Sequence, residues 1–225
     1  MKTIGILGGM GPLATCDLYK KIIELTPAKR DQDHLHLVID SYAQIEDRTE
    51  FILGKGADPL PKLVTSARLL KNAGCEAILM ACNTAHFFAP EIEKQTGVKI
   101  IHIAKTAVEA LKAAYPDAKN IAVIATSGTK KARVYDEILE REGLISVEFS
   151  AARQEALMSC IYEGVKAGKT EEFAPKFNET IAGIKADAYI AACTEIPMFL
   201  PYLDKPYKFI DATMELARAA VKFGL

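Results

Sequence analysis

Short hydrophobic runs alternate with longer segments of helical periodicity along the whole chain. The short runs are rich in β-branched residues, which is typical of buried parallel strands, and the longer segments suit helices that cross over a sheet. The pattern predicts strands near residues 4–7, 36–41, 77–80, 99–101, 121–125, 146–149, 188–192 and 209–211. It predicts helices over residues 13–24, 59–73, 88–95, 105–114, 130–141, 152–165, 171–184 and 212–221. The sequence therefore predicts an α/β fold with parallel-rich sheets flanked by helices.

The second half of the chain repeats the first in altered form. Residues 4–12 correspond to 121–129, the hydrophobic run before Cys82 corresponds to the run before Cys193, and 99–102 correspond to 208–211. The offsets of 117, 111 and 109 residues (121 minus 4, 193 minus 82 and 208 minus 99) keep one order and shrink slowly, which indicates a duplication. We therefore expect two pseudo-symmetric domains, one of residues 1–104 plus 212–225 and one of residues 105–211. The active site is expected in the cleft between them, because ligands bind beyond the carboxyl ends of parallel strands.

Composition and charge narrow the class of ligand. Lys and Arg total 28 against 29 Asp and Glu, a formal charge of -1 that gives no general attraction to nucleic acid or to an anionic membrane. The sequence has no secretory segment and no apolar stretch of about 20 residues that could span a bilayer. Five cysteines without Cys-x-x-Cys spacing suit a reducing compartment. These features predict a cytoplasmic protein without disulfides that binds a small molecule.

Cys82 and Cys193 carry the candidate chemistry. Each follows a predicted strand at a helix entrance, where the partial positive charge of unpaired N–H groups is expected to favour the thiolate. Two such thiols on opposite faces of a substrate carbon can remove a proton from one side and deliver one to the other, which inverts a stereocentre. The neighbouring Asn83, Thr84 and Thr194 offer hydrogen bonds to a carboxylate. No metal is expected, since Cys82 and its i+4 neighbour lack a second ligand pair, and no cofactor is expected.

Three motifs together resemble the cofactor-independent aspartate/glutamate racemase superfamily, and within it the aspartate racemases. They are Gly8-Gly9-Met10-Gly11-Pro12, Ala81-Cys82-Asn83-Thr84-Ala85-His86 and Ala192-Cys193-Thr194-Glu195, and the resemblance covers essentially the whole chain. It implies two pseudo-symmetric α/β domains, a homodimer, and racemisation without pyridoxal phosphate, with Cys82 and Cys193 as acid and base. The substrate-binding residues that it implies are Met10, Arg48, Asn83, Thr84, Thr126, Ser127, Lys166, Thr194 and Glu195.

Two cationic residues indicate whether the substrate carries a second carboxylate at the end of its side chain. Arg48 and Lys166 stand where racemases resembling this chain bind the distal carboxylate of aspartate, and a guanidinium fork plus a lysine suits that group. Glu195 and the Gly9-Met10 pair also match aspartate racemases rather than glutamate racemases. The long loop 42–58 predicts a mobile flap that carries Arg48. The sequence therefore predicts an aspartate racemase, with a broad-specificity amino-acid racemase as the alternative.

Two other interpretations stay open from the residues alone. Residues 9–14 fit the Gly-x-Gly-x-x-Ala fingerprint, and Asp40 ends the second strand, as in nicotinamide-dependent enzymes. A non-catalytic binding module made of two similar lobes would explain the duplication. Neither interpretation explains the matched cysteines.

The roles of a few single residues also stay open. Glu195 either orients a neighbouring group or simply occupies a first helical turn, and His86 is expected to be a helix-face residue rather than a base. Cys16, Cys75 and Cys160 are expected to be packing residues.

Overall fold

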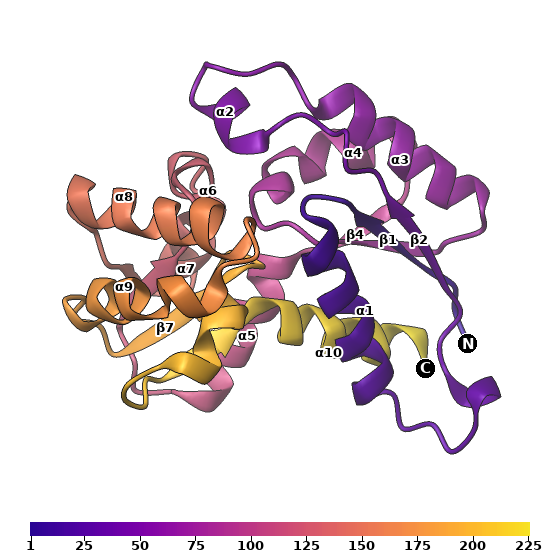
Figure 1. The fold of residues 1–225 in the computed structure, drawn as a ribbon. Helices are drawn as coiled ribbons and strands as arrows, with labels where there is room; N and C mark the ends of the chain where they lie inside the picture. Colours follow the sequence, from indigo (N-terminus) through magenta and orange to yellow (C-terminus); the bar gives the residue numbers. More distant parts are fainter.

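Two four-stranded parallel sheets with the same strand order form the computed structural model, which describes residues 1–225 (Figure 1). The order is β2-β1-β3-β4 in the first sheet and β6-β5-β7-β8 in the second, and every neighbouring pair is parallel. The strands are β1 Ile4–Gly8, β2 Leu37–Ser41, β3 Ala77–Met80, β4 Lys99–Ile101, β5 Asn120–Ile124, β6 Ile145–Ser146, β7 Ala188–Ala191 and β8 Phe209–Asp211. Equivalent segments of the sequence repeat occupy equivalent strands, so the expected α/β fold with two similar domains is confirmed.

Helices cover both sheets and connect their strands. The α-helices are α1 Pro12–Leu25, α2 Arg48–Ile52, α3 Leu60–Asn72, α4 Ala89–Thr96, α5 Ile103–Ala114, α6 Ser127–Lys131, α7 Asp136–Arg141, α8 Ala151–Ser159, α9 Thr170–Ala182 and α10 Ala212–Gly224. Three 3₁₀ segments are η1 Asp31–Asp33, η2 Thr84–Phe88 and η4 Ile196–Tyr202, and η3 Cys160–Val165 is a π-helical turn that continues α8. None of the helices is long and apolar enough to cross a membrane.

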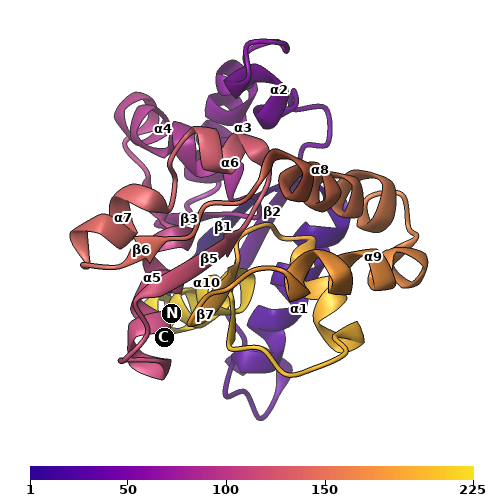
Figure 2. The same ribbon diagram turned by 90° about the vertical axis from the view of Figure 1, so that its left-hand side faces the viewer.

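The largest hydrophobic cluster spans both halves of the molecule. It joins residues of β1 such as Ile6 to residues of β5 such as Val123, through the buried faces of α5 and α10. Helix α10 follows the last strand of the second sheet but packs beside α1 and α5, and the backbone N–H of Lys2 donates to the carbonyl of Gly224 at 3.0 Å (Figures 1 and 2). The two sheets therefore share a core. The domain limits at residues 104 and 211 stay a prediction.

Four predicted elements differ in the structure. The helix expected over 130–141 is two short helices, α6 and α7, separated by Arg133, the one non-glycine residue with a positive φ (53°). The helix expected over 152–165 changes to π geometry at residue 160, and the strand expected over 146–149 is paired only at Ile145 and Ser146. The loop 42–58 contains helix α2, which begins at Arg48, and the mobility of this segment stays a prediction.

Candidate active site

Cys82 and Cys193 line one small cavity between the two halves. Each lies two residues beyond the last paired residue of the central strand before it, β3 or β7, and each is only 6% exposed. The cavity has a volume of about 20 Å³, which is room for about one water molecule. Its lining consists of Met10, Asp47, Arg48, Thr49, Cys82, Asn83, Thr84, Thr126, Tyr162, Lys166, Cys193, Thr194 and Glu195. The strand ends thus bring together two thiols that are 111 residues apart in the sequence.

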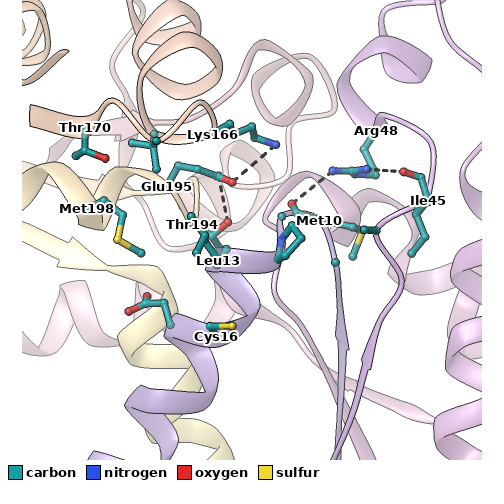
Figure 3. Close-up of a pocket in the computed structure, with 18 of the residues that line it drawn as sticks. Met10, Leu13, Cys16, Ile45, Arg48, Lys166, Thr170, Thr194, Glu195 and Met198 are labelled. Carbon is teal, nitrogen blue, oxygen red and sulfur yellow. Dashed lines mark hydrogen bonds and ion pairs between the residues drawn. The ribbon is translucent and has the colours of Figure 1, made fainter. Parts of the chain in front are cut away.

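A cleft of about 890 Å³ adjoins this cavity (Figure 3). The two share six lining residues, Met10, Asp47, Arg48, Lys166, Thr194 and Glu195. Beyond them the walls of the cleft carry apolar side chains, among them Leu13, Ile45 and Met198. The geometry is that of a narrow reaction chamber that continues into a wider entrance.

Glu195 faces Cys193 at the boundary between cavity and cleft. The Cys193 thiol donates to Glu195 Oε2 at 2.9 Å. The Thr194 hydroxyl donates to the same oxygen at 3.2 Å, and Lys166 Nζ lies 3.7 Å from Oε1 (Figure 3). Burial raises the pKa of the Cys193 thiol well above its ordinary value, and the negative charge of Glu195 adds to the rise. The expectation that the helix entrance favours the thiolate is therefore wrong for Cys193, because desolvation and a carboxylate outweigh the short η4 segment that follows.

Arg48 lies beside Cys82 on the opposite wall. Arg48 is 8% exposed, and its guanidinium donates to the backbone carbonyls of Glu46 at 2.7 Å, Ile45 at 3.1 Å and Met10 at 3.4 Å. Figure 3 shows the bonds to Ile45 and Met10, and the Nε of Arg48 has no partner. Burial alone would lower the pKa of Arg48, but attraction to Cys82 and Asp47 outweighs burial and raises it. One thiol therefore has a cation as its neighbour and the other has a carboxylate.

Asp47 and Tyr162 join the two halves beside Arg48, although no pattern in the sequence had assigned them to the site. Asp47 Oδ1 caps α2 by accepting from the backbone N–H of Thr49 at 2.7 Å and of Glu50 at 3.0 Å, and its Oδ2 accepts from the Tyr162 hydroxyl at 3.0 Å. Burial would raise the pKa of Asp47, but these hydrogen bonds and the Arg48 charge lower it. The carboxylate therefore stays charged and fixes the helix that carries Arg48.

Four threonine hydroxyls form a buried cluster, and three of these threonines, Thr49, Thr84 and Thr126, line the cavity. Thr84 Oγ1 lies 3.0 Å from Thr126 Oγ1 and 2.8 Å from Thr129 Oγ1, and the latter two are 3.1 Å apart. Thr49 Oγ1 donates to Thr126 Oγ1 at 3.4 Å. Thr49 and Thr84 belong to the first sheet and its helices, whereas Thr126 and Thr129 belong to the second. The cluster is thus a hydroxyl-lined seam between the halves, and Thr129 is a buried member that the sequence did not indicate.

Asn83 contacts the second half through Tyr135. The Tyr135 hydroxyl donates to Asn83 Oδ1, and Asn83 Nδ2 is buried without a partner. The adjacent His86 is also buried, with Nδ1 2.9 Å from the Cys82 carbonyl and Nε2 accepting from the Ile103 N–H at 3.2 Å. Burial lowers the pKa of His86 to about 3, so it is a neutral structural residue bonded at both nitrogens.

The remaining candidates divide into residues inside and outside the site. Ser127 begins α6 and lines neither the cavity nor the cleft. Cys16 is exposed on α1 and lines the cleft, so the expectation of a packing residue was wrong for it, whereas Cys75 and Cys160 are buried. The N–H of Gly9 donates to Thr15 Oγ1 at 2.9 Å, which leaves this amide of the glycine-rich turn engaged within the protein. No group of three or more His, Cys, Asp or Glu side chains is arranged to hold a metal ion.

Several known proteins similar to this chain are racemases. The model of the Asp/Glu/Hydantoin racemase family matches residues 7–220. The chain is 28% identical to the broad specificity amino-acid racemase RacX of Bacillus subtilis (strain 168), over 97% of this chain and 96% of that one. Its fold superposes on the Picrophilus torridus aspartate racemase with a TM-score of 0.87 and 28% identity, covering 100% of this chain and 94% of the other. A glutamate racemase from Francisella tularensis has the same fold, with a TM-score of 0.67 and 17% identity over 99% of this chain and 80% of that one.

Proposed function

Because the chain belongs to the Asp/Glu/hydantoin racemase family, we propose that it interconverts L- and D-aspartate by proton transfer between Cys82, Cys193 and the α-carbon. The observation that carries the proposal is the position of the two thiols, at matched ends of two matched sheets and on the wall of one cavity. Pyridoxal phosphate, metal ions and ATP have no part in the proposed reaction.

The proposed reaction conserves protons over one turnover. The thiolate on one face takes the α-proton, and the thiol on the other face gives its proton to the carbanion, which leaves the opposite enantiomer and the opposite pair of thiol and thiolate. The high pKa of Cys193 supports a resting state in which Cys193 is the thiol and proton donor. Cys82 then acts first as the base, beside the positive charge of Arg48.

The carbanion places negative charge on the α-carboxylate, so donors at those oxygens are required. The unpartnered Nδ2 of Asn83 is one candidate, and the hydroxyls of Thr84 and Thr126 are two more. The loss of one preorganised donor of this kind typically costs about a hundredfold to a thousandfold in rate. Since the cavity holds about one water molecule, side chains or segments of its wall move to admit an amino acid and then close on it.

Arg48 and Lys166 support aspartate as the substrate. Both line the cavity and the cleft, and both are cations that a distal carboxylate can approach from the entrance. The family resemblance further predicts a homodimer in solution, which size-exclusion chromatography with light scattering can test.

A broad-specificity amino-acid racemase is the second candidate. The ion pair of Lys166 with Glu195 already balances one of the two cations, so the attraction for a second substrate carboxylate is reduced. The adjoining cleft is wide and partly apolar, which accommodates longer side chains. The named activity of the Bacillus subtilis relative, broad specificity amino-acid racemase, agrees with this alternative.

Proton exchange in deuterated buffer tests the reaction and separates the two candidates. Purified protein without added cofactor is incubated with single enantiomers of aspartate, glutamate, alanine, methionine and lysine, with NMR for α-proton loss and chiral chromatography for inversion. A kcat/KM for aspartate at least about tenfold above the others supports the first candidate, and similar values support the second. Folded protein without exchange on any amino acid contradicts both.

Single substitutions test the two-thiol mechanism. Cys82→Ser and Cys193→Ser should each abolish racemisation, because a serine hydroxyl is far less acidic than a thiol. Cys75→Ser is the matched control, since that thiol is equally buried but lines neither the cavity nor the cleft. Wild-type turnover in Cys82→Ser or Cys193→Ser contradicts the mechanism.

Substitutions of two different lysines, one in the cavity and one outside it, test the recognition of the distal carboxylate. Lys166→Met should lower kcat/KM for aspartate by about tenfold or more relative to methionine, because a charged hydrogen bond is lost. Lys169→Met is the control, since Lys169 is exposed, pairs with Glu172 and does not line the cleft. Equal effects of Lys166→Met on aspartate and methionine argue against aspartate as the preferred substrate.

A further inference from the structure

We propose that Tyr135 is a positioning residue that holds the side-chain amide of Asn83 with its NH₂ group toward the substrate carboxylate. The inference deepens the proposed function and rests on it, because the orientation of the amide matters for catalysis only if a substrate carboxylate binds beside it.

The contacts of Tyr135 determine which end of the amide it holds. The ring is 1% exposed, and the one hydrogen bond of its hydroxyl is to Asn83 Oδ1. Burial raises the pKa of Tyr135 well above its ordinary value, so the phenol stays protonated and acts as a donor. A buried O–H requires an acceptor, and of the two ends of an asparagine amide only the oxygen accepts.

The same bond leaves the nitrogen of Asn83 for the cavity. Asn83 is 2% exposed and lines the chamber between the two thiols, and its Nδ2 has no partner in the protein. A buried donor without a partner lowers the stability of the protein. A bound ligand that supplies an acceptor would remove this cost. With the amide rotated by half a turn, Oδ1 would face the carboxylate oxygens and repel them, most strongly as the carbanion forms.

The local fold explains how a tyrosine from the second half reaches Asn83 in the first. The left-handed backbone at Arg133 ends the helical segment that begins at Ser127 and turns the chain before α7 begins at Asp136. Tyr135 is the residue directly before α7 and joins the core that both halves share. A continuous helix over residues 130–141 would not contain this turn. The break in the helix thus places the Tyr135 hydroxyl within hydrogen-bonding distance of Asn83 in the other half.

A double-mutant cycle tests the inference. Tyr135→Phe should lower kcat/KM for the best substrate by about tenfold to a hundredfold, because an Asn83 amide that is no longer held loses its charge-assisted hydrogen bond to the substrate carboxylate. In an Asn83→Ala background the same change should alter kcat/KM less than about twofold, because no amide remains to be oriented. A similar loss in both backgrounds would show that Tyr135 acts through general structure, and that result overturns the inference.

A matched tyrosine controls for the loss of a buried hydroxyl. Tyr189 is 5% exposed and donates to the Ile184 carbonyl at 2.7 Å, away from both the cavity and the cleft. Tyr189→Phe should lower thermal stability and leave kcat/KM within about twofold of wild type. A kinetic loss in Tyr189→Phe as large as in Tyr135→Phe likewise overturns the inference.

NMR tests the contact between Tyr135 and the Asn83 side-chain amide without depending on catalytic turnover. The side-chain amide signal of Asn83 in ¹⁵N-labelled protein is identified by its absence in Asn83→Ala. Tyr135→Phe should shift that signal, and Tyr189→Phe should leave it in place. Absence of racemisation in wild type would reject the proposed function alone, whereas an unshifted Asn83 signal in Tyr135→Phe would overturn the orientation by Tyr135.

Discussion

A single methyl group added at Gly128 should force the two halves apart at the active site. Gly128 lies in α6, and a Cβ there would be 2.6 Å from Thr49 Oγ1 and 2.7 Å from Thr49 Cα, whereas ordinary contacts begin at 3.4 Å. The backbone of α2 would therefore have to move by about 0.7 Å, the shortfall between 2.7 and 3.4 Å. Since Thr49 follows Arg48 in α2, the guanidinium beside Cys82 moves with it.

The displacement sets the expected size of the effect of Gly128→Ala. Overpacking of this kind typically costs about 1–3 kcal/mol of stability. A misplacement approaching 1 Å in an active site can cost about a hundredfold in rate, so we expect kcat/KM to fall by about tenfold to a hundredfold. Racemisation of the best substrate by chiral chromatography measures the rate, and urea denaturation measures the stability.

A second glycine shows whether the effect depends on position. A Cβ at Gly224 would also lie 2.6 Å from its nearest neighbour, but that atom is the end of the Leu35 side chain, near the amino end of β1. Gly224→Ala should therefore keep wild-type kinetics with a smaller loss of stability, because a side chain can rotate away. Wild-type kcat/KM in folded Gly128→Ala would refute the close apposition of α2 and α6 as a requirement for activity.

Three further predictions concern protonation and packing. The protonation of His86 should lower the free energy of unfolding by roughly 2 kcal/mol between pH 7 and pH 5. The reason is that the pKa of His86 is about 3 in the folded protein and 6.5 in the unfolded chain, so stability is lost as the pH falls below 6.5. This contribution to the pH dependence should vanish in His86→Asn. In a Cys82→Ser background, Glu195→Gln should lower the pKa of Cys193 and speed its alkylation by iodoacetamide near neutral pH, because the negative charge that raises that pKa is removed; an unchanged rate contradicts the role of Glu195. Phe199→Ala should destabilise the protein by about 3–5 kcal/mol in urea denaturation, because a fully buried ring that stacks on a second ring at 4.5 Å is lost.

Hydrophobic periodicity located the central strands β1, β3, β5 and β7 well, because buried parallel strands appear in the sequence as continuous apolar runs. The edge strand β6 is short and not buried, so its predicted bounds differ most from the structure. The repeat also placed both cysteines at equivalent strand ends, since the end of a run is a local signal. The break at Arg133 was not visible, because the Lys-Lys-Ala-Arg stretch has good helix propensity and the break depends on the burial of Tyr135 in a distant core.

Long-range contacts explain what the sequence did not predict in the site. The pKa of Cys193 depends on where the Glu195 side chain points and on the burial of the thiol, and neither follows from the spacing of two residues between Cys193 and Glu195. Thr129 enters the site through a contact with Thr84 in the other half. Helix α2 did have a local signal, since Asp47 and Glu50 have the spacing of a helix N-cap and its third residue.

The packing of α10 has a consequence for the order in which the protein forms during translation. The residues of α10 are the last of those in the shared core to leave the ribosome, yet they cover α1, which is among the first. A nascent chain therefore lacks the α10 side of this packing throughout the synthesis of the second half, when α1 has only its contacts within the first half, such as those with β1. The first half should therefore reach its full packing only after α10 has left the ribosome.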